Sequence, residues 1–335
     1  MSGRDVRRLA ARASTTTPEI KRDQVARAAV GAVAAGATRL FVVKEPFRIA
    51  TSAVQHLGLR ADIEVLDLGA ELRARDSERA AQAMREAGCG AIVVLGGDGT
   101  NRAVARAWPD APLVPLSTGT NNVFPVAVEA TAAGSAAGLV ASGRVDRDAV
   151  APRAKVVRVS IDDEEDDLAL VDAVLLEGDS TGNLMPFEPA RMRELVLSRA
   201  DPACVGTSPV GGLLHPCSAG DAFGVEVHCV APGQGGRPLL APISPGLFRP
   251  VYVRDSRILP LGEPVKVERA GVLAFDGDRE RRLVSGQTAT LRVQRDGPRV
   301  IDVRRTLALA ARDGLFFDRE HWHDAMTETP GLDCC

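Results

Sequence analysis

The pattern of apolar and polar residues divides the chain into two parts. In the first part, short apolar runs at residues 40–43, 63–66, 91–95 and 113–116 alternate with longer Ala-rich stretches that carry charges along one side, as at residues 22–35 and 77–87. Buried strands that alternate with amphipathic helices are typical of a parallel sheet covered by helices. The pattern therefore predicts that residues 1–148 form an α/β nucleotide-binding domain.

From about Ala151 the pattern changes to brief β-rich runs separated by clusters of Gly, Pro and Asp. The expected strands are residues 156–161, 168–176, 225–230, 265–267, 272–275, 291–293 and 300–303. This texture is typical of an antiparallel β domain, which we place at residues 149–305. The remaining residues, 306–335, begin with a helical pattern, and we expect this segment to pack back on the first domain.

Composition and charge indicate which kinds of partner the protein is expected to bind. The chain has 335 residues, 45% of them apolar and 25% charged, with a net charge of -3, which offers no long-range attraction to nucleic acid or to an acidic membrane. No apolar run approaches the roughly 18 residues that a membrane span needs, and the start lacks a secretory apolar segment. We expect a cytoplasmic protein that binds a small molecule and forms a homo-oligomer, without nucleic-acid or membrane partners.

Three features that resemble metal sites have simpler interpretations. The six cysteines include no C-x-x-C pair, so we expect reduced thiols rather than a disulfide framework or a zinc site. Six consecutive acids at residues 162–167 lie between two expected strands and are interpreted as a solvated hairpin tip. His321 and His323 lack a third ligand nearby in the sequence. None of these features determines the function.

The most informative segment is a glycine-rich loop after an expected strand. Residues 91–95 run into Gly96, Gly97, Asp98, Gly99 and Thr100, and a helical pattern follows at residues 101–107. Glycines let backbone N–H groups approach phosphate oxygens at such a strand-loop-helix turn. The single carboxylate of Asp98 can accept a proton or orient a magnesium ion. The simpler alternative is a tight turn in which Asp98 only caps the next helix.

A second loop favours the functional interpretation of the first. Thr118, Gly119, Thr120, Asn121 and Asn122 follow the apolar run at residues 113–116. They emerge at the same edge of the expected sheet, where open α/β sheets bind ligands. The chain has no G-x-x-x-x-G-K-[ST] motif, which excludes a P-loop, and no G-x-G-x-x-G dinucleotide motif. The phosphate loop is therefore expected to be of another type.

These segments resemble a known superfamily. Gly96 to Thr100 matches the GGDGT motif shared by NAD kinases and diacylglycerol kinases, and residues 116–125 are most similar to the acetoin catabolism protein X branch. In the second half, residues 207–212 resemble the S-T-P-T-G-S segment of NAD kinases, residues 218–220 resemble their S-A-G-G segment, and residues 275–278 fit their late D-G turn. The resemblance therefore covers most of the chain.

The resemblance implies two domains with the active site in the cleft between them. It also implies Mg²⁺-dependent transfer of a phosphoryl group from ATP to a hydroxyl, with Asp98 accepting the proton of that hydroxyl. The residues that the two loops and the resemblance assign to the nucleotide or the acceptor are Gly96, Gly97, Gly99, Thr100, Thr118, Gly119, Thr120, Asn121, Asn122, Asp172, Thr207, Ser208 and Gly211. No metal ligand is assigned.

This chain departs from the family pattern in three places, two of which bear on the acceptor. Where NAD kinases have an Asn-Glu pair, this chain has Val171 and Asp172, and Val210 and Gly212 replace hydroxyl side chains. Formation of NADP from NAD stays the first expectation. The alternatives are phosphorylation of another small hydroxyl compound or of a lipid, or a nucleotide-binding accessory protein without transfer activity. Relatives also open with an apolar strand before an N-P-x-S-G loop, so we expect the coding sequence to continue upstream of Met1.

Overall fold

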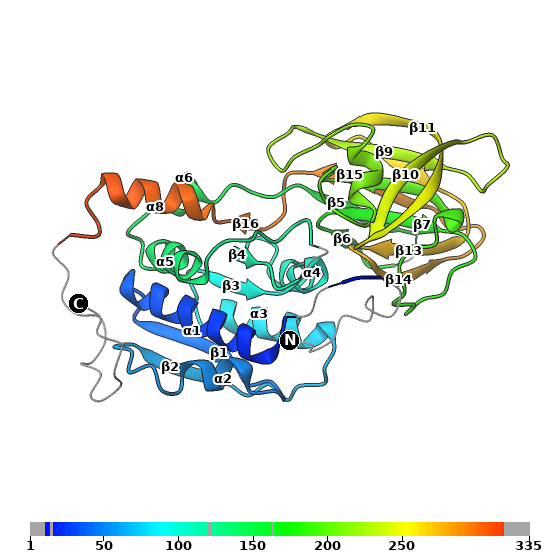
Figure 1. The fold of residues 1–335 in the computed structure, drawn as a ribbon. Coiled ribbons are helices and arrows are strands. Elements are labelled where there is room, and N and C mark those ends of the chain that lie inside the picture. The colour runs from blue at the N-terminus through cyan, green and yellow to red at the C-terminus, as the bar shows by residue number, and fades with distance from the viewer. Residues whose placement is uncertain (1–10, 14–15, 120–121, 163, 318–335) are drawn as a thin grey trace.

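The computed structural model describes residues 11–13, 16–119, 122–162 and 164–317. Figure 1 shows two regions side by side, an α/β region made mainly by the first half of the chain and a β region made by the second half. The strands of the first region pair in parallel, and those of the second pair antiparallel. The expected fold class is therefore confirmed.

The first region contains most of the helices. In chain order its elements are α1 (Pro18–Ala34), β1 (Arg39–Val43), α2 (Ile49–Val54), β2 (Asp62–Leu66), α3 (Ala74–Glu86), β3 (Ile92–Leu95), α4 (Asp98–Ala107), β4 (Pro112–Leu116), α5 (Ala130–Ala141) and α6 (Arg147–Val150). Its strands form two separate parallel sheets instead of one, because β1 pairs with β2 and β3 pairs with β4, while no ladder joins β1 to β3.

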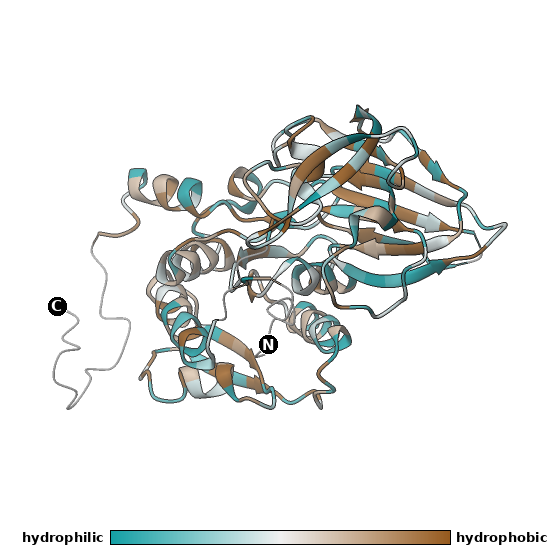
Figure 2. Cartoon of the chain, turned by 45° about the vertical axis from the view of Figure 1, so that its right-hand side comes forward, coloured by the Kyte–Doolittle hydropathy of each residue, from teal (hydrophilic) through white to brown (hydrophobic). Residues whose placement is uncertain are grey.

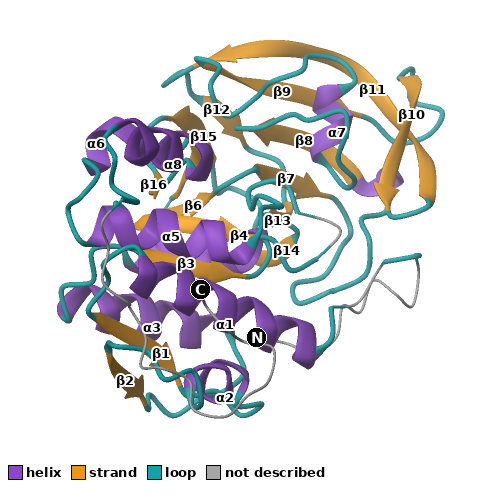
Figure 3. Cartoon of the chain, turned by 60° about the vertical axis from the view of Figure 1, so that its left-hand side comes forward, coloured by secondary structure: helices purple, strands orange, loops and turns teal. Residues whose placement is uncertain are grey.

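Glycines allow helices α1 and α5 to pack unusually closely. A Cβ atom on Gly134 of α5 would lie 1.9 Å from the Ala28 carbonyl oxygen of α1, and one on Gly138 would lie 2.3 Å from the Ala32 carbonyl oxygen. Only glycine fits at such a distance. Helices α1 and α5 therefore lie side by side (Figure 3), while α3 and α4 pack together as a second pair.

The second region is a sandwich of two antiparallel sheets. Its elements are β5 (Val156–Ile161), β6 (Asp167–Ala169), β7 (Asp172–Leu176), η2 (Pro189–Arg191), β8 (Met192–Leu197), α7 (Ser208–Gly212), β9 (Phe223–Cys229), β10 (Arg237–Ser244), β11 (Leu247–Pro260), β12 (Val265–Val267), β13 (Gly271–Phe275), β14 (Asp278–Leu283) and β15 (Ala289–Gln294). The seven-stranded sheet has the order β10-β11-β9-β8-β7-β13-β14, and the four-stranded sheet has the order β12-β15-β5-β6.

The core of the sandwich lies between the two sheets. Val159 and Leu291 of the four-stranded sheet belong to the same buried cluster as Leu175 and Phe275 of the seven-stranded sheet. Apolar strands run through the interior of this region, as Figure 2 shows in brown. Two facing sheets with interdigitating apolar side chains give a rigid platform, and the turn after β13 projects from it toward the first region.

The structure differs from the sequence expectations at three places. Residues 168–176 were expected as one strand, but they split into β6 and β7 because the chain passes from one sheet to the other. Residues 300–303 were expected in the β domain, but β16 (Arg299–Val300) pairs with β4 of the first region. Helix α8 (Val303–Arg312) starts before the expected position 306 and packs against α5.

The run of acids at residues 162–167 is also not a uniformly solvated tip. Asp167 is buried and forms ion pairs at 3.4 Å with both Arg106 of α4 and Arg281 of β14. Asp162 and Asp166 are exposed, as expected. Asp167, at the end of the run, thus links the two regions through Arg106. The sequence did not indicate this role.

The described residues also test the expectations on membrane-spanning helices and on the cysteines. None of the described helices is both long and apolar enough to cross a membrane. Cys89, Cys204, Cys217 and Cys229 are free thiols. The remaining expectations on His321, His323 and the first ten residues lie outside the described part of the chain.

We expect Gly134→Ala to destabilise the protein, because the new methyl group would collide with the backbone of α1. Overpacking of this kind costs about 1–3 kcal/mol. Chemical denaturation should show this loss, whereas Ser142→Ala, at the exposed end of the same helix, should change stability by less than about 0.5 kcal/mol. Equal stability of Gly134→Ala and the wild type would show that α1 and α5 do not pack as closely as described.

Candidate active site

Most of the residues assigned from the sequence line one cavity. This cavity has a volume of about 1420 Å³ and takes residues from both regions. Its lining includes Gly97, Asp98, Gly99, Thr100, Thr118, Gly119, Asn122, Asp172, Thr207 and Ser208. Gly96 and Gly211 are absent from the lining, while Thr120 and Asn121 lie outside the described residues. The structure therefore brings together loops that are far apart in the sequence.

The glycines allow the two loops of the first region to touch. A Cβ on Gly97 would lie 2.7 Å from the Asn122 Oδ1 atom, and a Cβ on Gly96 would lie 2.6 Å from the Thr100 Cβ atom. Asn122 donates a hydrogen bond from Nδ2 to Ser117 Oγ at 2.9 Å. Gly96 therefore serves close packing, and Gly97 lets the loop after β4 lie against the start of α4.

Asp98 is the first residue of α4 and connects the two loops. Its carboxylate accepts hydrogen bonds from the backbone N–H groups of Val123, at 3.2 Å, and Phe124, at 2.8 Å. The N-cap of α4 is Gly97, and the Asp98 side chain makes no capping bond to its own helix. The interpretation of Asp98 as a simple helix cap is therefore wrong.

The surroundings of Asp98 favour its protonated form. Desolvation by the surrounding protein, followed by the charge of Asp276, raises the pKa of Asp98 to about 7, although the two N–H groups and Arg199 act in the opposite direction. Arg199 stacks on the Phe124 ring at 4.4 Å and donates to the Val123 and Phe124 carbonyl oxygens. A carboxyl group with a pKa near 7 can accept and release a proton at neutral pH.

Asp172 and Asp276 come from the second region and lie at the same cavity. Thr207 donates from Oγ1 to Asp172 Oδ2 at 2.6 Å, while Asp172 Oδ1 is buried without a hydrogen-bond partner among the described residues. Burial and the nearby charge of Asp276 raise the pKa of Asp172 to about 8. The Asp276 carboxylate accepts the N–H groups of Leu170 and Val171 at 2.8 and 2.7 Å.

The sequence analysis did not assign Arg102, which lies one helical turn after Asp98. Its side chain is only 3% exposed and forms ion pairs with Asp276, at 3.8 Å, and with Glu280. The guanidinium group also lies 5.6 Å from the centre of the Phe275 ring. Arg102 therefore holds α4 of the first region against the turn between β13 and β14. Its position four residues after Asp98 was the only indication in the sequence.

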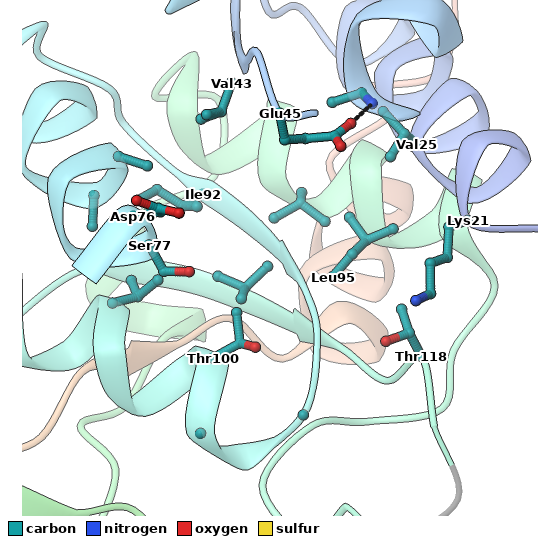
Figure 4. Close-up of a pocket in the computed structure, with 18 of the residues that line it drawn as sticks. Lys21, Val25, Val43, Glu45, Asp76, Ser77, Ile92, Leu95, Thr100 and Thr118 are labelled. Atoms are coloured by element: carbon teal, nitrogen blue, oxygen red, sulfur yellow. Dashed lines mark hydrogen bonds between the residues drawn. The ribbon is translucent and has the colours of Figure 1, made fainter. Parts of the chain in front are cut away.

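Lys21 of α1 is a second cation that the sequence analysis missed. Its side chain is buried, lines the cavity and points toward Thr118, as Figure 4 shows. Desolvation lowers the pKa of Lys21. A buried ammonium group beside the start of a helix favours the binding of an anion. The Ala-rich helical pattern around Lys21 gave no reason to separate it from other surface lysines.

The residues that depart from the NAD kinase pattern have structural roles. Val171 and Val210 are core residues with at most 1% of their surface exposed. A Cβ on Gly212 would lie 2.5 Å from the Pro202 backbone nitrogen, so no hydroxyl side chain fits there without movement of the chain. Gly211 is likewise packed against Leu197 and Ala200. Close packing therefore accounts for the missing hydroxyl side chain at Gly212, whereas Val171 and Val210 are apolar residues of the core.

A separate cluster of ionisable groups lies on the β sandwich. Glu194, Glu226 and His228 come from the neighbouring strands β8 and β9 and place one ligand atom each within 4.8 Å of the others. His228 also pairs with Asp255, and Glu226 pairs with Arg257. The cluster has its own cationic partners and does not belong to the cavity that Asp98 lines.

Comparison with known proteins agrees with the two-part architecture. The family model of the ATP-NAD kinase N-terminal domain matches residues 19–145, and that of the acetoin catabolism protein X C-terminal domain matches residues 155–296. The chain is 33% identical to acetoin catabolism protein X of Cupriavidus necator over 327 residues, which cover 94% of this chain and 91% of that protein.

Two solved structures show weaker similarity. The crystal structure of yeast NADH kinase complexed with NADH has a TM-score of 0.49 and 14% identity, covering 90% of this chain and 86% of that one. The structure of an NAD kinase from Archaeoglobus fulgidus in complex with ATP has a TM-score of 0.39 and 14% identity, covering 84% and 99%.

The first region, with its glycine loop and Asp98, matches the N-terminal domain of ATP-NAD kinases and has the NAD kinase-like fold. Within that class, the chain belongs to the acetoin catabolism protein X family. The resemblance inferred from the GGDGT loop and from residues 116–125 is confirmed.

The raised pKa of Asp172 predicts that the metal-free protein loses stability as the pH rises. In the folded state the Asp172 carboxyl group keeps its proton up to about pH 8, whereas in the unfolded chain it releases the proton near pH 4. The free energy of unfolding therefore falls as the pH rises from about 4 to about 8. Asp172→Asn removes this penalty. It should stabilise the protein at pH 8 by about 1–3 kcal/mol and have little effect at pH 4.

Thermal melts in a metal chelator between pH 4 and 8.5 measure this difference. The matched control is Asp62→Asn, which alters an exposed carboxylate of β2 outside the cavity. If Asp172→Asn lowers the melting temperature at pH 8, the carboxylate is ionised in the folded protein and the prediction is wrong.

Proposed function

We propose that the protein is an ATP-dependent kinase that transfers a phosphoryl group to a hydroxyl of a small molecule, with NAD as the first acceptor and NADP as its product. The observation that carries this proposal is the position of Asp98. Its carboxylate lies at the start of α4, lines the cavity and has a pKa raised to about 7. Phosphoryl transfer depends on positioning, on charge stabilisation and on a group that accepts the hydroxyl proton.

The phosphates of ATP would bind at the glycine-rich edge of the first region. The first N–H groups of an α-helix have no partner within the helix, and Gly97, Asp98 and Gly99 at the start of α4 line the cavity. Thr118 and Gly119 line the cavity beside this loop, and Lys21 supplies positive charge. This arrangement supports binding of a polyphosphate, and in the proposed reaction Asp98 would accept the proton of the acceptor hydroxyl.

The donor set also suits a magnesium ion. Mg²⁺ prefers carboxylate oxygens and water, and Asp172 Oδ1 is a buried oxygen without a hydrogen-bond partner among the described residues. Asp172 and Asp278, which both line the cavity, would hold the ion. When bound, it would neutralise charge on the phosphate oxygens. Thr207 donates its 2.6 Å hydrogen bond to the other oxygen, Asp172 Oδ2, and thereby orients the carboxylate.

The acceptor side contains Asp172, Thr207 and Ser208. Asp172 replaces the glutamate of the NAD kinase pair, and Val171 replaces its asparagine, so one amide that would hold a dinucleotide is missing. Because this amide is missing, another small hydroxyl compound or a lipid is an alternative acceptor. The alternative outside the enzymes is a nucleotide-binding accessory protein without transfer activity. We also propose that the protein acts in the cytoplasm as a homo-oligomer.

We expect Asp98→Asn to reduce turnover by about 10²–10⁴-fold, because asparagine keeps the shape of the side chain but cannot accept a proton. Steady-state consumption of ATP with the best acceptor measures the loss, and a thermal melt with Mg-ATP measures retained binding. Asp62→Asn, distant in sequence and exposed on β2, is the control. Retention of more than about a tenth of the activity with an unchanged melt would exclude Asp98 as the base.

An acceptor screen separates the candidate functions. We expect ATP consumption and a phosphorylated product with NAD, and the screen should include small diols and diacylglycerol as separate acceptors. Product should be identified by mass spectrometry, since ATP hydrolysis alone does not show transfer. Mg-ATP binding without consumption for any acceptor would support the accessory protein instead.

A further inference from the structure

A group of metal-ligand side chains lies on one face of the β sandwich. Glu194 of β8 pairs in register with His228 of β9, which pairs in turn with Asp255 of β11. Glu226 lies two residues before His228 on β9, so its side chain is on the same face of the sheet. In Figure 3 these three strands lie apart from α1 and β1, and none of the four residues lines the cavity that contains Asp98.

The distances within this group match those between the ligands of one metal ion. The His228 Nε2 atom lies 3.0 Å from Glu194 Oε2 and 3.3 Å from Glu226 Oε1. One ligand atom from each of the three residues lies within 4.8 Å of the other two. Nitrogen and oxygen ligands at about 2.0–2.2 Å from a tetrahedral zinc ion are roughly 3.3–3.6 Å apart. Small side-chain movements would therefore place all three atoms around one ion.

Hydrogen bonds within the group leave polar atoms unsatisfied. The Nε2 atom of an imidazole donates at most one hydrogen bond, whereas two carboxylates face that of His228. Glu194 Oε1 is buried without a hydrogen-bond partner among the described residues. Burial, followed by the charge of Glu226, raises the pKa of Glu194 to about 9. Without a metal, Glu194 is therefore protonated at neutral pH, and a bound cation would take the place of that proton.

The neighbouring arginines leave the facing oxygens available. Arg257 pairs with Glu226 through the other oxygen, Oε2, and Arg254 lies 3.8 Å from Asp255. In the part of the chain that the structure describes, no lysine or arginine forms an ion pair with Glu194. Two glutamates therefore face one imidazole nitrogen, and only one of them has a permanent cation as its partner.

Asp255 holds the His228 ring in the orientation that a metal ligand requires. Its carboxylate pairs with Nδ1, while Nε2 faces the two glutamates. Histidines that bind metals usually donate their second ring N–H to a carboxylate or a carbonyl, which leaves the lone pair of the first nitrogen for the ion. The side chains of Glu226, Glu194 and His228 are 5%, 14% and 32% exposed, so an ion can enter from the His228 side.

We propose that Glu194, Glu226 and His228 bind one divalent transition-metal ion, for which Zn²⁺ is the best match, and that Asp255 positions the His228 ring. Mg²⁺ and Ca²⁺ take oxygen ligands, whereas a set of one imidazole and two carboxylates suits Zn²⁺. A fourth tetrahedral position remains for water. The ion would join β8 to β9 at the edge of the sandwich core, to which Val196, two residues after Glu194, belongs.

Titration with Co²⁺, a spectroscopic substitute for Zn²⁺, tests the proposal on protein stripped of metal by a chelator. We expect saturable d–d absorption without thiolate charge-transfer absorption, which excludes binding by cysteines. Glu194→Gln and His228→Gln should weaken binding by more than about 100-fold, and Asp255→Asn, which alters only the supporting carboxylate, by about 10–100-fold. Glu268→Gln and His56→Gln alter exposed residues outside the group and should bind Co²⁺ as the wild type does.

A second measurement keeps the test decisive if a variant folds poorly. Zn²⁺ at about 100 times its Kd should raise the melting temperature of the wild type and of Asp172→Asn by at least about 2 °C, and should leave Glu194→Gln unchanged. Glu194→Gln itself should fold, since it replaces a carboxyl group that is protonated without metal. Neither measurement involves ATP, so failure of the kinase proposal leaves this test intact.

Three results would overturn the proposal. If Zn²⁺ leaves the wild-type melt unchanged, His228 serves only as an ion-pair partner of the surrounding acids. If Glu194→Gln binds Co²⁺ as tightly as the wild type, the ion lies elsewhere in the protein. If the Zn²⁺ effect disappears in Asp172→Asn and persists in Glu194→Gln, the ion binds at the cavity instead of on the sandwich.

Discussion

The structure depends on the burial of three carboxylates against one cavity. Burial raises the pKa of Asp98, Asp172 and Asp276, and the charge of Asp276 raises the pKa of Asp98 and of Asp172 further. Like charges in a site of low polarity are unfavourable unless they bind protons, cations or hydrogen-bond donors. The protein provides backbone N–H groups and Arg102 for Asp276, but among the described residues one oxygen of Asp172 has no hydrogen-bond partner.

This arrangement also holds the two regions together. Arg102 belongs to α4, whereas its partner Asp276 belongs to the β13–β14 turn and its partner Glu280 to β14. Arg106 and Asp167 form a second contact of the same kind. Buried ion pairs contribute little net stability, yet breaking one by removing a partner is strongly destabilising. The position of Asp98 relative to Asp172 is therefore set by charge pairs that require both regions.

The class of fold and the two loops of the first region could be predicted because they depend on local patterns. Alternation of apolar runs and helical stretches is read directly from the chain, and the glycines around Asp98 mark a close backbone approach. Arg102, Lys21 and Asp276 could not be assigned in this way, since their importance arises from partners that are distant in the sequence. Strand β14, with the sequence DRERRL, lacks the apolar alternation that identifies a strand.

The sequence also did not indicate that β1 and β3 belong to separate sheets, because each has the apolar pattern of a strand inside a single sheet. The geometry of Asp98 depends instead on the loop after β4, because the backbone N–H groups of Val123 and Phe124 hold its carboxylate.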